Sequence, residues 1–146
     1  TDKKINNNTC NTKRRPDLII SSTENFIINI ECDESQHIGY PEDCESAKIS
    51  ETIEEFFPLN KDNKFHFIVV RWNPDNYKYK NVRGSKSRQE RLDLLAKCIE
   101  KISQKTDWTD DDFGRHYYMF YNKDNESITK KNPKTFIYDD EDIMKI

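Results

Sequence analysis

The sequence predicts an α/β domain with a mixed β-sheet flanked by helices, and three observations predict this fold class. Short apolar, β-rich runs at 18–20, 26–30 and 65–71 have the length and composition of strands. Two longer segments, 43–57 and 88–104, carry apolar residues at helical spacing. A turn joins the first two strands and a helix joins the second to the third, so we expect both antiparallel and parallel strand pairs.

The 146 residues are expected to form one domain, because this length suffices to bury most of the surface that the unfolded chain exposes. Apolar residues make up 34% and charged residues 35% of the chain, but the apolar ones are concentrated in strands and helical stripes, unlike those of disordered chains. We divide the domain into a polar lead-in at 1–12, a core at 13–77 and a peripheral part at 78–146. The chain lacks an initiator Met and opens on a polar run, so we expect it to be excised from a longer protein.

The first two strands are expected to form a hairpin. Pro16 favours extended backbone before it, so Asp17 should begin the first strand. The polar segment 21–25 predicts a turn, and the run from Phe26 predicts the second strand. Alternation divides the second strand into two faces, one with Ile27, Asn29, Glu31 and Asp33 and the other with Phe26, Ile28, Ile30 and Cys32.

Three carboxylates are expected to meet at one edge of this hairpin. Glu31 and Asp33 point the same way, and Asp17 lies across from the outer end of their strand. Carboxylates this close repel and raise one another's pKa unless a cation sits among them, which favours a hard divalent metal held by these three acids. The alternative is a cluster that binds no metal and pairs with basic side chains, namely Arg14, Arg15 and Arg71.

Turn-forming residues at 33–43 predict a loop that leaves the carboxylate end of the sheet, where catalytic side chains are common. Asp43 is expected to cap the helix that follows, which ends before Pro58. Because this helix starts beside the acidic edge, Glu45 is a candidate for the outer shell of the metal, and Lys48 is a candidate for a positive charge near the acids. An ordinary solvated helical face is the alternative.

The run 65–71 is apolar on both faces, which predicts a central strand parallel to one of the earlier strands. Arg71 ends this strand, where it is a candidate to contact a phosphate or to pair with Glu31. Residues 76–87 mix Tyr with Lys and Arg without apolar periodicity, which predicts a loop. Such a loop suits a nucleic-acid backbone, and plain surface is the alternative.

The last third of the chain is expected to add peripheral elements. The helix at 88–104 should bury the stripe formed by Leu92, Leu95, Ile99 and Ile102. The aromatic run 116–121 predicts a strand, and 135–138 predicts a short edge strand.

The net charge of -3 does not by itself indicate a nucleic-acid-binding protein, since phosphate binding usually shows as a basic balance. Basic residues nevertheless gather at 13–15, 78–91 and 130–134. A solvated surface of mixed charge is the alternative. The candidates for phosphate contacts are Arg14, Arg15, Arg71, Lys78, Lys80 and Arg83.

Four cysteines show no CxxC spacing, and no signal peptide or transmembrane-length run is visible, which favours a reducing intracellular compartment. Cys10, His37 and Cys44 match no standard zinc template, so structural Zn²⁺ is not expected. Cys32 and Cys98 fall on apolar faces and are expected to be small core residues.

Four consecutive blocks, KRRPD, IECDESQHIGY, CESAK and IVVRWNPDNY, lie between Lys13 and Tyr77. A Pro-Asp followed by an acid-x-acid at the end of an apolar strand resembles the PD-(D/E)XK restriction-endonuclease superfamily, in particular its branch around the very short patch repair and homing-type endonucleases. In that branch a strand ends in Glu-x-Asp followed by His, as Glu31, Asp33 and His37 stand here. The blocks are also similar to predicted nucleases of large DNA viruses. The chain departs from the pattern where the usual lysine, two residues after the Glu, is Asp33.

The resemblance implies a restriction-endonuclease-like core with its catalytic part at 13–77, and an endonuclease that nicks or cuts duplex DNA with Mg²⁺, for which Mn²⁺ can substitute. Asp17 and Glu31 would bind the ion, Asp33 would complete its shell or orient water, and His37 would act as general acid or base. For His37 a hydrogen bond that orders the loop is the alternative. A nucleic-acid-binding module that does not cleave and a protein-interaction domain are the alternative functions.

Overall fold

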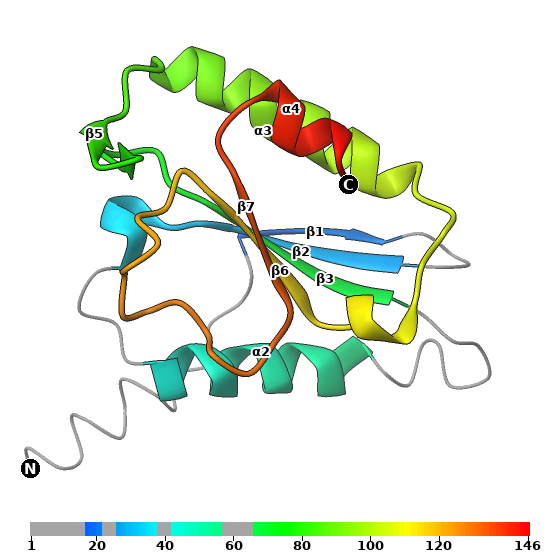
Figure 1. Cartoon of the computed structure of the whole chain (residues 1–146). Coiled ribbons are helices and arrows are strands. Elements are labelled where there is room, and N and C mark those ends of the chain that lie inside the picture. Colours follow the sequence, from blue (N-terminus) through cyan, green and yellow to red (C-terminus); the bar gives the residue numbers. More distant parts are fainter. Residues whose placement is uncertain (1–16, 22–25, 38–41, 57–65) are drawn as a thin grey trace, which may run out of the picture.

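A five-stranded mixed β-sheet forms the centre of the molecule, with helices on both faces (Figure 1). The computed structural model describes residues 17–21, 26–37, 42–56 and 66–146. The strand order is β1-β2-β3-β6-β7, in which the β1–β2 pair is antiparallel and the other three pairs are parallel. The predicted α/β class with a mixed sheet is therefore confirmed. The strands of this sheet are β1 (Leu18–Ser21), β2 (Phe26–Cys32), β3 (His66–Trp72), β6 (Arg115–Met119) and β7 (Lys134–Ile137).

The helices on the two faces of the sheet cover different residues of the same strands. Helix α2 (Glu42–Phe56) covers one face, and its Ile49 packs with Ile27 and Val69. Helices α3 (Arg88–Ser103) and α4 (Asp140–Met144) cover the other face, where Cys98 packs in the cluster that holds Val70. None of the helices in the described part of the chain is both long and apolar enough to cross a bilayer.

The predicted hairpin and central strand are confirmed. Strand β1 pairs with β2 in a register that sets Leu18 opposite Ile30, and the side chains of β2 alternate between the two faces as expected. Strand β3 lies between β2 and β6, and its residues from Phe67 to Trp72 are all buried. The edge strand expected at 135–138 is β7.

Several local expectations were wrong. Asp43 lies inside α2, which begins at Glu42, so it is not the residue before the helix. Cys32 is exposed because it ends its strand, whereas Cys98 is buried as expected. The buried stripe of α3 is shifted by the way the helix sits on the sheet, so Leu92 is 46% exposed. The buried residues of α3 are Arg91, Leu94, Cys98 and Ile102.

Within 76–87, where we expected a loop, strands β4 (Lys78–Tyr79) and β5 (Val82–Arg83) form a small hairpin. Its turn residues Lys80 and Asn81 have φ of 53° and 63°, which the apolar pattern does not reveal. The hairpin is closed by Gly84, whose N–H donates to Tyr77 O at 2.8 Å. A Cβ at position 84 would overlap the Tyr77 ring, so this close approach requires glycine.

Candidate functional site

The candidate site lies at the carboxyl ends of two adjacent parallel strands. The β2–β3 register sets Glu31 beside Arg71, and residues paired in this way share one face of a sheet. Asp33 follows β2 directly, and its N–H donates to Trp72 O at 2.8 Å, which continues the pairing by one residue. The fold therefore brings two carboxylates and a guanidinium together on the face covered by α2.

Glu31 forms an ion pair with a lysine of α2. Lys48 Nζ lies 2.8 Å from Glu31 Oε1, and the two side chains are 12% and 2% exposed. Burial raises the pKa of Glu31 above its ordinary value, the Lys48 and Arg71 charges act in the opposite direction, and the Asp33 charge adds to the rise. Lys48 thus stands beside the acidic strand, where we expected a positive charge.

Asp33 belongs to a buried polar cluster with Arg71 and Tyr121. Arg71 Nη1 lies 3.1 Å from Asp33 Oδ2 and 3.4 Å from Oδ1, and the Tyr121 hydroxyl donates to Asp33 Oδ2. Burial, and after it the Asp33 charge, raises the pKa of Tyr121. Arg71 therefore pairs with Asp33, and Tyr121 is a partner that sequence reasoning did not single out.

Asp17 lies at the start of β1 and is exposed. Continuing the β1–β2 register by one residue sets it opposite Glu31, and its Oδ2 accepts a hydrogen bond from the Cys32 N–H at 2.7 Å. Burial, followed by the Asp17 charge, raises the pKa of the Cys32 thiol. Across the described ranges, no three Asp, Glu, His or Cys side chains come close enough to hold one metal ion.

The carboxylates nevertheless fit a magnesium ion. Mg²⁺ usually keeps several waters and is bound by one or two protein carboxylates together with substrate phosphates. Glu31 Oε1 is buried, and its partner among the described residues is the Lys48 ammonium at 2.8 Å. The carboxylate of Glu31, with that of Asp33 two residues later, matches the one or two protein carboxylates that such an ion takes.

Asn29 is a buried polar group at this site that has no side-chain partner among the described residues. It lies two residues before Glu31 on the same face of β2 and is 0% exposed. Neither its Oδ1 nor its Nδ2 has a hydrogen-bond partner among the residues that the structure describes. Burial of unpaired polar groups costs about 1–3 kcal/mol, so Asn29 lowers stability where it stands. Sequence reasoning placed Asn29 on this face and gave it no role.

A tight turn follows Asp33, in the short helix η1 (Glu34–His37). Ser35 and Gln36 have φ of 51° and 55°, which is unfavourable for residues other than glycine. Buried Gln36 holds the turn: its Nε2 donates to Asn76 O at 2.9 Å, and its Oε1 accepts from the Asn122 N–H at 2.6 Å. The strain is therefore balanced by hydrogen bonds to two distant loops.

Some candidates cannot be placed. The side chains of His37 and Glu45, and all of Arg14, Arg15 and Cys10, lie outside the described residues. Cys44 takes part in a disulfide bond, so its sulfur is not the thiolate that zinc requires. A disulfide is more typical of oxidising compartments, and the reducing compartment stays a prediction.

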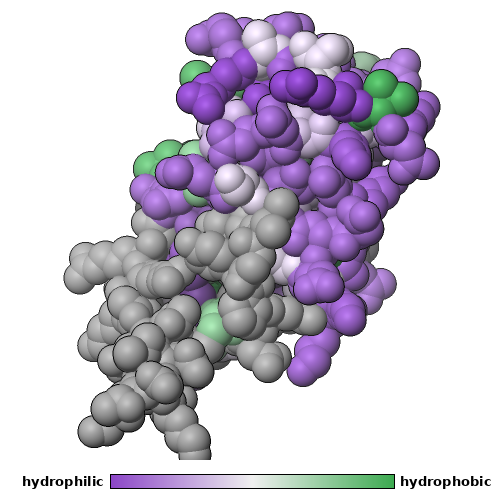
Figure 2. Space-filling view, turned by 90° about the vertical axis from the view of Figure 1, so that its left-hand side faces the viewer, coloured by the Kyte–Doolittle hydropathy of each residue, from purple (hydrophilic) through white to green (hydrophobic). Residues whose placement is uncertain are grey.

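A basic groove lies at the β4–β5 hairpin and has a volume of about 380 Å³. Lys80 Nζ lies 5.1 Å from the centre of the Tyr79 ring, and Lys123 Nζ lies 6.0 Å from that of Tyr138. Arg83 is exposed, and its Nη2 lies 3.5 Å from Asn76 Oδ1. Figure 2 faces the hairpin end of the molecule, where the described surface is mostly hydrophilic. The groove is lined by Lys78, Tyr79, Lys80, Asn81, Asn122, Lys123, Asp124 and Tyr138.

Comparisons of the chain with protein-family models, with curated proteins and with solved structures each found no match.

Proposed function

We propose that this domain is a Mg²⁺-dependent endodeoxyribonuclease with a restriction-endonuclease-like core, which hydrolyses phosphodiester bonds of duplex DNA. One observation carries the proposal. Lys48 Nζ lies 2.8 Å from Glu31 Oε1 at the carboxyl end of β2, and Asp33 follows two residues later. This arrangement supplies the two acids and the lysine that the resemblance implies, with the lysine on α2 in place of the strand.

The roles of the acids follow from their surroundings. Glu31, with its buried carboxylate beside Lys48, and Asp17, which directly precedes the neighbouring strand, would hold the magnesium ion. When bound, the ion would lower the pKa of its water and offset the negative charge that develops on the phosphate. Asp33 accepts hydrogen bonds from Arg71 and Tyr121. In our proposal it therefore orients Arg71 and adds negative charge beside Glu31.

Two cations would act on the scissile phosphate. Lys48 is held by Glu31 and places a positive charge at the acidic strand end, where it attracts the phosphate and stabilises added charge. Arg71 is fixed by Asp33 on the same face of the sheet, and its planar guanidinium suits a phosphate oxygen. A general acid or base role for His37 remains a proposal from the resemblance.

The basic groove would hold the DNA backbone. Lys78, Lys80 and Lys123 line it together with the rings of Tyr79 and Tyr138. Lysines that follow a groove and aromatic rings that can stack on bases are typical of nucleic-acid surfaces.

Nicking of supercoiled plasmid tests the proposal. We expect the wild-type protein to nick with Mg²⁺ or Mn²⁺ and not with EDTA. Glu31→Gln and Lys48→Met should each slow nicking by about a hundredfold or more, because each removes a charge that acts on the reacting phosphate. Lys97→Met is the matched control, since Lys97 pairs with Asp140 of α4 on the opposite face. Nicking that is independent of metal, or that survives both site variants, would contradict the proposal.

A DNA-binding module that does not cleave is the second candidate. Asp33 is already neutralised by Arg71 and hydrogen-bonded to Tyr121, as in a cluster whose role is structural. Salt-dependent DNA binding without nicking at any Mg²⁺ or Mn²⁺ concentration would favour this candidate.

A further inference from the structure

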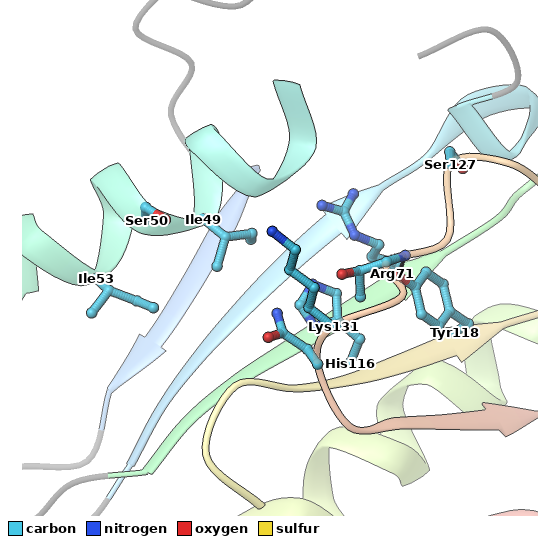
Figure 3. Close-up of a pocket in the computed structure, with 10 residues that line it drawn as sticks. Ile49, Ser50, Ile53, Arg71, His116, Tyr118, Ser127 and Lys131 are labelled. Carbon is cyan, nitrogen blue, oxygen red and sulfur yellow. Dashed lines mark hydrogen bonds between the residues drawn. The ribbon is translucent and has the colours of Figure 1, made fainter. Parts of the chain in front are cut away.

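A cavity of about 260 Å³ lies beneath α2 (Figure 3). Figure 3 shows Ile49 and Ile53 extending from the helix, and Arg71 and Lys131 extending toward the helix from below. One wall of the cavity is therefore apolar, and the other is polar. The remaining lining residues are Ser50, His116, Tyr118, Ser127, Thr129 and Asn132.

The charged residues of this cavity are basic. Arg71 and Lys131 line it, and no Asp or Glu is among the described residues of its wall. Asp33 and Glu31 both offset the Arg71 charge, so the net positive charge at the cavity comes from Lys131, which is exposed at the surface. The cavity therefore favours an anionic ligand over a neutral or cationic one.

Thr129 indicates where such a ligand would bind. The residue is 5% exposed, and its backbone N–H donates to the Tyr118 hydroxyl oxygen at 2.9 Å. Its hydroxyl Oγ1 is buried and has no hydrogen-bond partner in the described part of the chain. A buried hydroxyl on a cavity wall is a donor that lacks an acceptor, and an anionic oxygen is the strongest acceptor for it.

His116 forms part of the polar wall. Its Nδ1 lies 2.9 Å from Gly114 O, so Nδ1 carries the hydrogen and the ring orientation is fixed. Its strand neighbours place it on the same face as Val69, below α2. The cavity thus combines a rigid polar wall with the apolar wall of Ile49 and Ile53.

We propose that this cavity binds a phosphate group that carries a nucleoside. Lys131 supplies positive charge, Thr129 Oγ1 donates a hydrogen bond to a phosphate oxygen, and the two isoleucines of α2 contact the nucleoside. The phosphate comes either from a nucleic-acid strand or from a free nucleotide, and both share this chemistry. This proposal is separate from the proposed cleavage at Glu31, because the cavity would bind the nucleotide without hydrolysing it.

Calorimetric titration of the full chain in EDTA tests this site. The probes are inorganic phosphate, thymidine 5′-monophosphate and thymidine. We expect the monophosphate to bind more tightly than phosphate, and thymidine not to bind detectably. Lys131→Ala should weaken monophosphate binding about tenfold, and Thr129→Val roughly threefold, as expected for losing one charged and one neutral donor.

Lys130→Ala is the matched control, since it removes the same charge from the adjacent exposed residue, which does not line the cavity. Its affinity for the monophosphate should stay within about twofold of wild type. Thr129→Val keeps the shape of the side chain and removes an unpaired hydroxyl, so the empty protein should unfold at an unchanged or higher temperature.

Unchanged monophosphate binding in both Lys131→Ala and Thr129→Val would overturn the proposal, as would an equal loss in Lys130→Ala. Failure of the wild-type protein to bind phosphate or monophosphate would also overturn it. If a short DNA duplex displaces the monophosphate, the natural ligand is a nucleic-acid strand. If the duplex and the monophosphate bind together, the natural ligand is a free nucleotide.

Glu31→Gln separates this site from the proposed nuclease function, because this variant should lose nicking and still bind the monophosphate.

Discussion

At the scale of single residues, Glu31 is both buried and a candidate metal ligand. Its pKa is raised from 4.5 mainly by burial, which outweighs the attraction of Lys48. The folded state therefore binds the Glu31 proton more tightly than the unfolded state does. Between pH 4.5 and the raised folded pKa, the free energy of unfolding falls as pH rises. Ionised Glu31 thus costs stability at neutral pH.

Replacing Glu31 by Gln should remove this pH dependence. The stability of the variant relative to wild type should increase as pH rises from 4.5 and level off above the folded pKa, because Gln has no charge to desolvate. Urea unfolding at intervals between pH 4 and pH 8 measures this difference. Parallel stability curves for the two proteins would show that Lys48 fully compensates for burial.

Asn29 offers a separate test of a stability cost at the site. Asn29→Leu keeps the approximate volume and removes two polar atoms that have no partner among the described residues, so we expect the free energy of unfolding to rise by about 1–2 kcal/mol. Chemical denaturation measures this change. Asn73→Leu is the control, because Asn73 Nδ2 donates to Phe120 O at 2.8 Å and its loss should destabilise the protein. Equal destabilisation by both changes would show that Asn29 has partners.

At the scale of elements, the β4–β5 hairpin borders the basic groove that we propose to hold DNA. We expect simultaneous neutralisation of Lys78, Lys80 and Lys123 to weaken binding about equally for all DNA sequences, and to lower the salt slope by roughly one unit per phosphate contact. Fluorescence anisotropy at several salt concentrations measures both quantities.

The control for the hairpin is an equal change of charge elsewhere. Lys97, Lys101 and Lys145 are exposed on or next to α3 and α4, and their neutralisation should leave the salt slope nearly unchanged. If the salt slope of DNA binding falls equally in both triple variants, DNA responds to the overall charge of the protein and the groove has no special role.

At the scale of the whole molecule, the Asp33, Arg71 and Tyr121 cluster connects β2, β3 and the segment after β6. All three residues are buried, so removing Arg71 leaves the Asp33 carboxylate in the interior without its guanidinium partner. Such a loss typically costs about 3–5 kcal/mol, a large part of the roughly 5–15 kcal/mol that stabilises a domain.

Arg71→Met should therefore destabilise the whole domain by about 3–5 kcal/mol, and adding Asp33→Asn should restore part of that loss. Thermal and urea unfolding of the single and double variants measure the effect. Arg88→Met removes the exposed pair with Asp75 and should cost at most about 1 kcal/mol. A loss for Arg71→Met no larger than for Arg88→Met would mean that the buried cluster contributes little.

The sequence alone was sufficient for the features that depend on neighbours along the chain. Apolar runs and turn residues predicted the β1–β2 hairpin, the central β3 and the helices α2 and α3. Alternation along β2 placed Asn29, Glu31 and Asp33 on one face. The resemblance, by contrast, implied functions that stay proposals, because the comparisons found no relative.

Only the tertiary structure decided which cation meets which acid. Arg71 pairs with Asp33 across 38 positions of the chain, and Tyr121 reaches Asp33 across 88. Lys48 meets Glu31 because α2 crosses the sheet at that point. Periodicity reports which face a side chain occupies, whereas partners in a buried site are selected by desolvation and packing between distant segments, for which no local pattern exists.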